Sequence, residues 1–82
     1  TDYRQALADS MEDGKPVLLD FWGVSCKACT LMDTTTLKNS DVQRRLNEFH
    51  CVRIQGDNGV GRDLAKSFKI IGFPTYIVIM GK

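Results

Sequence analysis

The sequence has no apolar run that approaches the ~20 residues needed to span a bilayer, and it shows no signal peptide. It also lacks repeats, low-complexity tracts and linkers. Its 82 residues are close to the lower limit of what one hydrophobic core stabilises, so we expect a single domain over residues 1–82. A chain that starts at Thr1 is expected to be either a mature form or one domain of a longer membrane protein.

A strong charge of either sign is missing as well, because the net charge is +1. This balance gives no reason to expect nucleic acid or an anionic membrane surface as the main partner. The adjacent Arg44 and Arg45 are interpreted as the solvated side of a helix. The glycine-rich segment 56–61 has neither the GxGxxG spacing nor the Lys-Ser/Thr ending of a phosphate-binding loop, so it predicts an ordinary polar loop.

Cysteine is scarce and odd in number, with three residues in the chain. An odd count excludes a small scaffold stapled by disulfides, since one thiol would stay unpaired. Cys26 and Cys29 form a close pair, whereas Cys51 stands alone and is expected to be a buried small hydrophobic residue. A pair with a singleton indicates chemistry at the pair.

Periodicity and turn residues predict an alternation of helices and strands. Apolar residues at helical spacing predict a helix over 3–13, with Asp2 as its N-cap and Gly14 as its stop. The run 17–22 is apolar except at Asp20, which is typical of a strand buried on both faces. A helix is expected from residue 26, followed by a helical piece capped by Asn39 or Ser40. The residues of the first of these expected to face inward are Ala28, Leu31, Met32 and Leu37. The remaining expected elements are a strand over 51–55, a helix over 62–68 and a strand over 75–80. This order predicts an α/β fold, a mixed β-sheet flanked by helices.

The CxxC pair follows the first predicted strand directly. Cys26 is therefore expected at the N-terminus of a helix, where unpaired N–H groups and the helix dipole stabilise a thiolate. A lowered thiol pKa makes Cys26 both a better attacking group and a better leaving group in thiol–disulfide exchange. Cys29, one turn further on, is expected to be more buried and to resolve the mixed disulfide.

A structural zinc site is the alternative interpretation of the same cysteines. Cys26, Cys29, His50 and Cys51 together make four ligands. Against it, His50 and Cys51 are consecutive in a predicted strand, so their side chains should point to opposite faces. No second CxxC or HxxxH accompanies the pair, and we expect no metal. The context of strand, CxxC and helix favours redox chemistry.

Two segments carry a resemblance to a known family. DFWGVSCKAC at residues 20–29 resembles the active-site segment of thioredoxins, and GFPT at residues 72–75 resembles their cis-proline loop. The resemblance covers nearly the whole chain. Within this superfamily the chain is most similar to the C-terminal, periplasmic thioredoxin-like domain of DsbD-type thiol:disulfide interchange proteins. The segments that indicate this are KPVLLD at 15–20, the Lys27-Ala28 dipeptide and the interrupted helix through NSDVQ at 39–43.

The resemblance implies roles for the acids near the dithiol. Asp20 would be the buried carboxyl that exchanges protons with Cys29, and burial should raise its pKa. Asp33 lies four residues after Cys29 on the same helical face. It is interpreted either as a second acid that tunes the Cys29 thiol or as an exposed helix carboxylate. Trp22 would pack beside the dithiol.

The second motif implies a binding role. Pro74 would be a cis proline facing the disulfide, and the backbone of Phe73 would pair with an extended partner segment. The chain departs from thioredoxins at Ser25, where they carry Trp, and at Lys27 and Ala28, where they carry Gly-Pro. Lys27 favours the Cys26 thiolate, but screening by solvent keeps this effect small. Because a more stable thiolate makes the pair more oxidising, these departures leave the direction of electron flow open.

The resemblance also implies a larger whole. A complete fold of this family has a strand before the first helix and a strand plus helix after residue 80, so we expect a fold truncated at both ends and an exposed apolar edge at 75–80. The function implied is a protein thiol–disulfide oxidoreductase, a reductant relay that uses transient mixed disulfides with partner proteins and needs no cofactor. It would act as a monomeric domain in the bacterial periplasm or cell envelope, the alternative location being cytoplasmic. The alternative function is a thioredoxin-like binding module, or a zinc-stabilised fold, with structural cysteines.

Overall fold

The computed structural model describes residues 2–81 and confirms the predicted order of elements. The elements are α1 (Tyr3–Asp13), β1 (Val17–Trp22), α2 (Lys27–Thr34), the 3-10 turn η1 (Thr36–Lys38), α3 (Ser40–Leu46), β2 (His50–Gln55), α4 (Gly59–Ser67) and β3 (Thr75–Ile79). Within this range no helix is both long and apolar enough to cross a bilayer.

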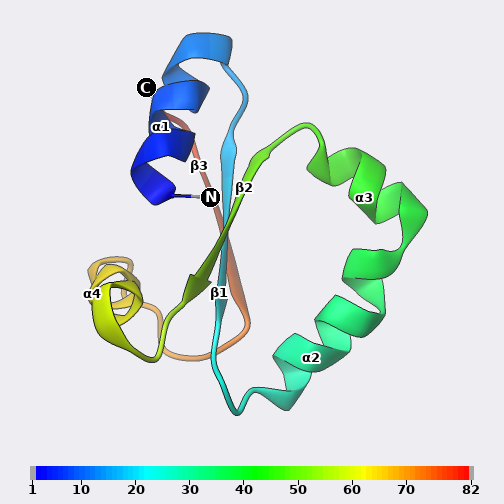
Figure 1. Cartoon of the computed structure of the whole chain (residues 1–82), viewed down its shortest axis with the longest axis vertical. Helices are drawn as coiled ribbons and strands as arrows, with labels where there is room; N and C mark the ends of the chain where they lie inside the picture. The colour runs from blue at the N-terminus through cyan, green and yellow to red at the C-terminus, as the bar shows by residue number, and fades with distance from the viewer. Residues whose placement is uncertain (1, 82) are drawn as a thin grey trace.

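The sheet is mixed, with strand order β2-β1-β3. Central strand β1 is parallel to β2 and antiparallel to β3, with Phe21 beside both Ile54 and Thr75. In Figure 1, α1 and α4 lie on one side of the sheet, and α2, η1 and α3 form an arc on the other. This confirms the predicted α/β fold with helices on a mixed sheet.

The hydrophobic core lies between the sheet and the helices α1 and α4. Alternate residues of a strand point to opposite faces, so Val17, Leu19 and Phe21 all enter this core and are fully buried. The opposite face of β1 carries Leu18, Asp20 and Trp22. The core residues contributed by the other elements are Ala6, Val52, Ile54 and Ala65.

The residues predicted to cap or end the helices are confirmed for α1 and α3. The Asp2 carboxylate accepts a hydrogen bond from the Arg4 N–H at 3.1 Å, and so caps α1. Gly14 ends α1 with φ of +77°, a left-handed conformation that side chains disfavour. Of the two caps considered for α3, the Asn39 side chain is the one used, accepting from the N–H groups of Asp41 and Val42.

Three expectations about burial and bounds are wrong. Ala28 and Leu31 of α2 are exposed, because the arc turns these positions away from the sheet, and Cys29 is the buried residue of that helix. Cys51 is exposed, since its face of β2 is not the one covered by α1 and α4. Helix α4 begins at Gly59, inside the segment predicted as a loop.

The expected exposed edge is present at β3. This strand forms one edge of the described sheet, and the side chains of Val78 and Met80 are exposed there. Ile77 and Ile79, which alternate with them, pack against the core from the other face. The edge therefore offers backbone groups and apolar side chains together.

Candidate active site at the dithiol

Cys26 and Cys29 form a disulfide at the first turn of α2, with their Cα atoms 5.2 Å apart. Cys26 is the N-cap residue, and its Sγ accepts a hydrogen bond from the Cys29 N–H at 3.0 Å. Cys29 is only 6% exposed, whereas Cys26 is less buried. An N–H aimed at Sγ favours negative charge on that sulfur, and Cys26 is the more accessible of the two cysteines.

A cavity of about 360 Å³ opens over this end of the disulfide. It is lined by Cys26 but not by Cys29, which agrees with the difference in burial. Lys27 and Ala28, the first residues of α2, line it as exposed groups. The other lining residues are Gly23, Ser25, Asp57 and Phe73.

The sheet topology brings the proline loop to the same edge. Parallel strands β1 and β2 end here together, and antiparallel β3 begins here, with Thr75 beside Phe21. The Phe73–Pro74 peptide bond is cis. Chain segments that are more than 40 residues apart thus meet at the dithiol because of strand order alone.

The Phe73 ring is held between two glycines that the sequence analysis did not single out. A Cβ at Gly23 would lie 3.1 Å from the ring, and a Cβ at Gly56 would overlap it. Gly23 follows β1 and Gly56 follows β2, so both strand ends leave a slot for the ring. A glycine directly after a strand signals such a close approach, although it does not say to what.

Asp57 is a further site residue that sequence reasoning missed. Its Oδ2 accepts from the Val24 N–H at 2.9 Å, and its Oδ1 accepts from the Gln55 side-chain amide at 2.9 Å. The Val24 hydrogen bond first, and the Gln55 bond second, hold the pKa of the Asp57 carboxyl below its usual value. Asp57 therefore fixes the loop that leads into the dithiol.

Asp20 is buried, as expected, on the sheet face opposite the core. Burial raises the pKa of the Asp20 carboxyl, while Arg53 opposes that rise. The Arg53 Nε lies 3.4 Å from Asp20 Oδ2, and its Nη2 lies 3.1 Å from Asp33 Oδ2. The Arg53 guanidinium also lies 5.5 Å from the centre of the Trp22 ring. Asp33 and Trp22 are thus joined to Asp20 through a residue that the sequence analysis did not select.

The four-ligand zinc alternative is wrong on geometric grounds. His50 and Cys51 pair with Val17 and Leu18 at the start of the parallel strands, whereas Cys26 follows their other end. Six strand residues separate the two ends by roughly 17 Å, far beyond a zinc bond. His50 instead contacts Asp13, with Nε2 and Oδ2 2.8 Å apart. Throughout residues 2–81, no three His, Cys, Asp or Glu side chains are grouped as metal ligands.

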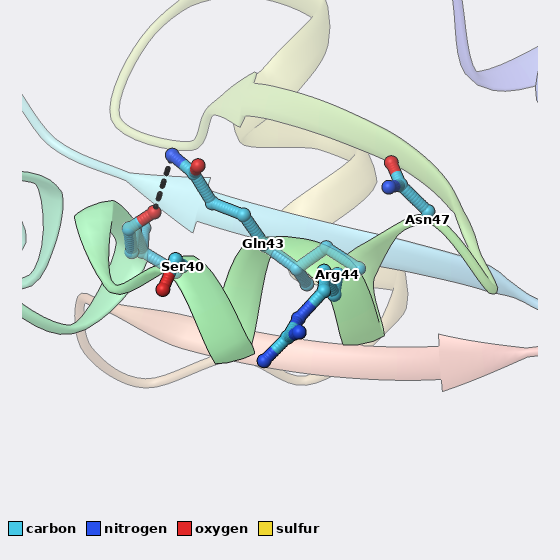
Figure 2. Close-up of a pocket in the computed structure, with 6 residues that line it drawn as sticks. Ser40, Gln43, Arg44 and Asn47 are labelled. Atoms are coloured by element: carbon cyan, nitrogen blue, oxygen red, sulfur yellow. Dashed lines mark hydrogen bonds between the residues drawn. The ribbon is translucent and has the colours of Figure 1, made fainter.

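A second hollow of about 640 Å³ lies along α3 (Figure 2). Gln43 donates a hydrogen bond across it to the carbonyl of Leu37 at 3.3 Å, as the dashed line in Figure 2 shows. The remaining lining residues are Ser40, Arg44, Leu46 and Asn47. None of the side chains that line this hollow is a thiol or a carboxyl.

Comparison with known proteins agrees with this geometry. A family model described as thioredoxin-like matches residues 1–80. The chain is 32% identical over 74 residues to thiol:disulfide interchange protein DsbD 1 of Pseudomonas aeruginosa, covering 88% of this chain and 12% of that protein. It is 29% identical over 77 residues to DsbD of Vibrio cholerae, covering 92% of this chain and 13% of that protein. The chain therefore spans a small part of the length of these relatives.

Solved structures show the same fold. A thioredoxin from Thermus thermophilus superposes with a TM-score of 0.83 at 30% identity, covering 93% of this chain and 59% of that one. The oxidised DsbD C-terminal domain of Neisseria meningitidis superposes with a TM-score of 0.73 at 23% identity, covering 95% of this chain and 71% of that one. The relatives' names and the disulfide support redox activity and agree with the expected thiol–disulfide oxidoreductase. The chain belongs to the thioredoxin-like family.

Proposed function

We propose that residues 1–82 act as one domain that exchanges disulfides with partner proteins through Cys26 and Cys29. Residues 1 and 82 lie outside the described part of the chain. The observation that carries the proposal is the Cys26–Cys29 disulfide at the N-cap of α2, with Cys26 lining an open cavity. This arrangement supports a reactive outer sulfur and a shielded inner one.

In the reducing direction, the Cys26 thiolate attacks one sulfur of a partner disulfide. A bond forms between Cys26 and that sulfur, and the partner's other sulfur leaves and takes up a proton. The Cys29 thiol then gives its proton to the Asp20 carboxylate and attacks Cys26 Sγ, which releases the partner's second sulfur. The partner gains two electrons from the Cys26–Cys29 pair. Its first sulfur takes a proton from water, and its second sulfur, released as a thiolate, takes the Cys29 proton back from Asp20.

Phe73 and Pro74 are proposed to orient the partner. Proline has no N–H, so the backbone of Phe73 is the group at this loop that would pair with an extended segment. The Phe73 ring held against Gly23 and Gly56 supports this role, because a seated ring fixes the backbone beside it. Lys27, Ala28, Trp22 and Asp33 are proposed to tune the potential of the pair.

The likeness to thiol:disulfide interchange proteins supports a reductant relay as the physiological direction. We propose that the chain works as a monomeric domain of a larger membrane protein in the bacterial envelope, without a cofactor. Cell fractionation with an antibody to the chain distinguishes this location from a cytoplasmic one.

The reduction potential of the Cys26–Cys29 pair tests the direction. Equilibration with glutathione, read by alkylation and mass spectrometry, is expected to give a value near that of thioredoxin, about −270 mV. A value near about −120 mV, typical of a strong oxidant, would contradict the reductant relay.

Mixed-disulfide trapping tests the roles of the two sulfurs. The Cys29→Ser variant is expected to accumulate a partner bound at Cys26, because the resolving thiol is missing. Cys26→Ser serves as the control and is expected to trap nothing, since Cys29 is buried. Partners that attach to Cys51 in the Cys29→Ser variant would overturn Cys26 as the nucleophile.

A further inference from the structure

Asp57 belongs to the loop after β2 and not to the CxxC segment, yet it contacts the turn that leads into Cys26. Its carboxylate accepts a hydrogen bond from the Val24 N–H, and it lines the same cavity as Cys26. We propose that Asp57 is a positioning residue, which holds this turn in the conformation that makes Cys26 reactive. The inference rests on the proposed function, in which Cys26 is the attacking sulfur.

The register of β1 with β2 brings Asp57 to this turn. The separation of 33 residues between Val24 and Asp57 continues the register in which Trp22 pairs with Gln55. Just beyond the strands, a backbone bond joins the Gly56 N–H to the Trp22 carbonyl at 2.8 Å. The next link between the two chain segments is made by a side chain, because Asp57 Oδ2 accepts from the Val24 N–H at 2.9 Å.

The Val24 N–H is available to Asp57 because of its place in the turn. The Cys26 N–H donates to the Gly23 carbonyl at 3.3 Å, which closes a turn with Val24 at its second position. That bond uses the N–H of the fourth residue, so the N–H of the second residue has no partner inside the turn. The Asp57 carboxylate supplies one, and such charge-assisted bonds are roughly twice as strong as neutral ones.

Two further contacts hold Asp57 itself in place. Its Oδ1 accepts from the Gln55 side-chain amide at 2.9 Å, and its backbone carbonyl accepts from Arg62 Nη2 at 2.9 Å. The bond from Val24 and then that from Gln55 lower the pKa of the Asp57 carboxyl, so both oxygens are acceptors near neutral pH. A carboxylate restrained in this way is a rigid support for the turn.

The turn determines where the Cys26 sulfur lies relative to α2. Cys26 is the N-cap of this helix, and its Sγ accepts from the Cys29 N–H at 3.0 Å, a contact that favours negative charge on the sulfur. A change in the turn would move the cap residue and lengthen that contact. The Phe73 ring packs on the same turn at Gly23, but it supplies no hydrogen bond there.

The charge of Asp57 acts in the opposite direction from its hydrogen bond. A carboxylate in the cavity of Cys26 repels a thiolate, whereas the bond to Val24 favours the thiolate through the turn. Asparagine separates the two effects, because it keeps an acceptor oxygen and carries no charge. The Gln55 amide can turn over and accept from the new amide group, so Asp57→Asn retains both contacts. Lys27, the other charged residue that lines this cavity, stays unchanged in every variant.

Alkylation of the reduced 82-residue chain by iodoacetamide tests the inference without a partner protein. The rate at Cys26, read by mass spectrometry over a series of pH values, has a midpoint that reports formation of the thiolate. We expect Asp57→Ala to raise this midpoint by about half a pH unit, equivalent to an about threefold lower rate at a pH below it. Asp57→Asn should shift the midpoint upward by less than half as much, or shift it downward.

Asn58→Ala is the matched control, since it removes a neighbouring side chain that makes no capping bond. Its midpoint should equal that of wild type, and the exposed Cys51 should react equally in all variants. An Asp57→Ala midpoint at or below that of Asn58→Ala would overturn the inference. So would an Asp57→Asn midpoint raised by half or more of the Asp57→Ala shift, because the bond would then not be the cause.

Val24→Pro keeps the inference testable if Asp57→Ala fails to fold. Proline has no N–H and suits the second position of a turn, so this change removes the donor and leaves the Asp57 charge in place. Its midpoint should rise as in Asp57→Ala. Val24→Ala keeps the N–H and should match wild type, because the Val24 side chain is 70% exposed. A Val24→Pro midpoint equal to that of Val24→Ala would contradict a role for the bond.

Failure of the proposed function is seen in a different measurement. A chain whose Cys26 is alkylated, but which traps no partner as the Cys29→Ser variant, contradicts disulfide exchange with partner proteins. The alkylation midpoints are still obtained in that case, and they show whether Asp57 positions Cys26.

Discussion

At the scale of single residues, Asp20 links stability to chemistry. Its carboxyl is buried, and burial raises its pKa despite the nearby Arg53. A raised carboxyl pKa in the folded state contributes stability below the unfolded value of about 3.9, and this contribution is lost as the pH rises through the folded value. Ionisation of Asp20 therefore destabilises the folded protein relative to the unfolded chain.

Asp20→Asn is expected to be more stable than wild type at pH 7, because an amide never ionises. The advantage should disappear below about pH 4, where the wild-type carboxyl is neutral in both states. The rate at which Cys29 attacks Cys26 Sγ should fall by about tenfold. This loss is smaller than that usually caused by removing a general base, because some Cys29 thiolate forms without Asp20. Urea titrations at pH 4 and pH 7 and single-turnover rates measure these effects.

Asp63→Asn, at an exposed position of α4, is the control for that comparison. It should change neither the pH dependence of stability nor the exchange rate. An Asp20→Asn protein that is less stable than wild type at pH 7 would show that the bond to Arg53 outweighs the burial of the charge.

At the scale of elements, the ends of β1 and β2 determine how the proline loop is seated. Glycine is required at position 56 because the Phe73 ring occupies the space where a Cβ would be. Overpacking of this kind typically costs about 1–3 kcal/mol. The loop and its cis peptide bond thus depend on residues that follow other strands.

Gly56→Ala is expected to destabilise the protein by about 1–3 kcal/mol and to slow the formation of mixed disulfides, because Phe73 must move. Gly72→Ala, in the same loop, is the matched control: its Cβ would meet no atom within 4 Å. That variant should stay within about 0.5 kcal/mol of wild type. Equal effects of the two substitutions, in urea titration and in trapping rate, would contradict the seating of the ring.

At the scale of the whole molecule, a small hydrophobic core packs the sheet against α1 and α4. Leu19 lies at its centre, fully buried in the middle strand between Val52 and Ile77. A domain of 82 residues has a small stability margin, on the order of 5 kcal/mol. The free-energy cost of a single cavity in this core is therefore a large fraction of the total stability.

Leu19→Ala is expected to cost about 2–5 kcal/mol, which is about half or more of the stability margin. Leu31→Ala removes the same atoms from a side chain that is 62% exposed on α2. It should change stability by less than about 0.5 kcal/mol. Thermal unfolding followed by circular dichroism compares the two, and a similar loss in both would show that the arc packs more tightly than described.

Several features of this protein were determined by the sequence alone, because their signals are local. The Asp2 cap, the Gly14 stop and the apolar run of β1 each specify backbone conformation within a few residues. The same holds for the dithiol, since a CxxC directly after a strand places its first cysteine at a helix N-cap. These signals were sufficient for the α/β fold and for Cys26, Cys29 and Asp20 as candidates.

Only the tertiary structure decided which face of each element is covered and which distant residues meet. Periodicity predicts the two faces of α2 or β2 but not the neighbour on either, so Leu31 and Cys51 were expected inward and are exposed. Strand register places Arg53 beside Asp20, and the loops after parallel strands bring Asp57 and Phe73 to the dithiol. Such contacts join residues many positions apart, and no local propensity encodes them.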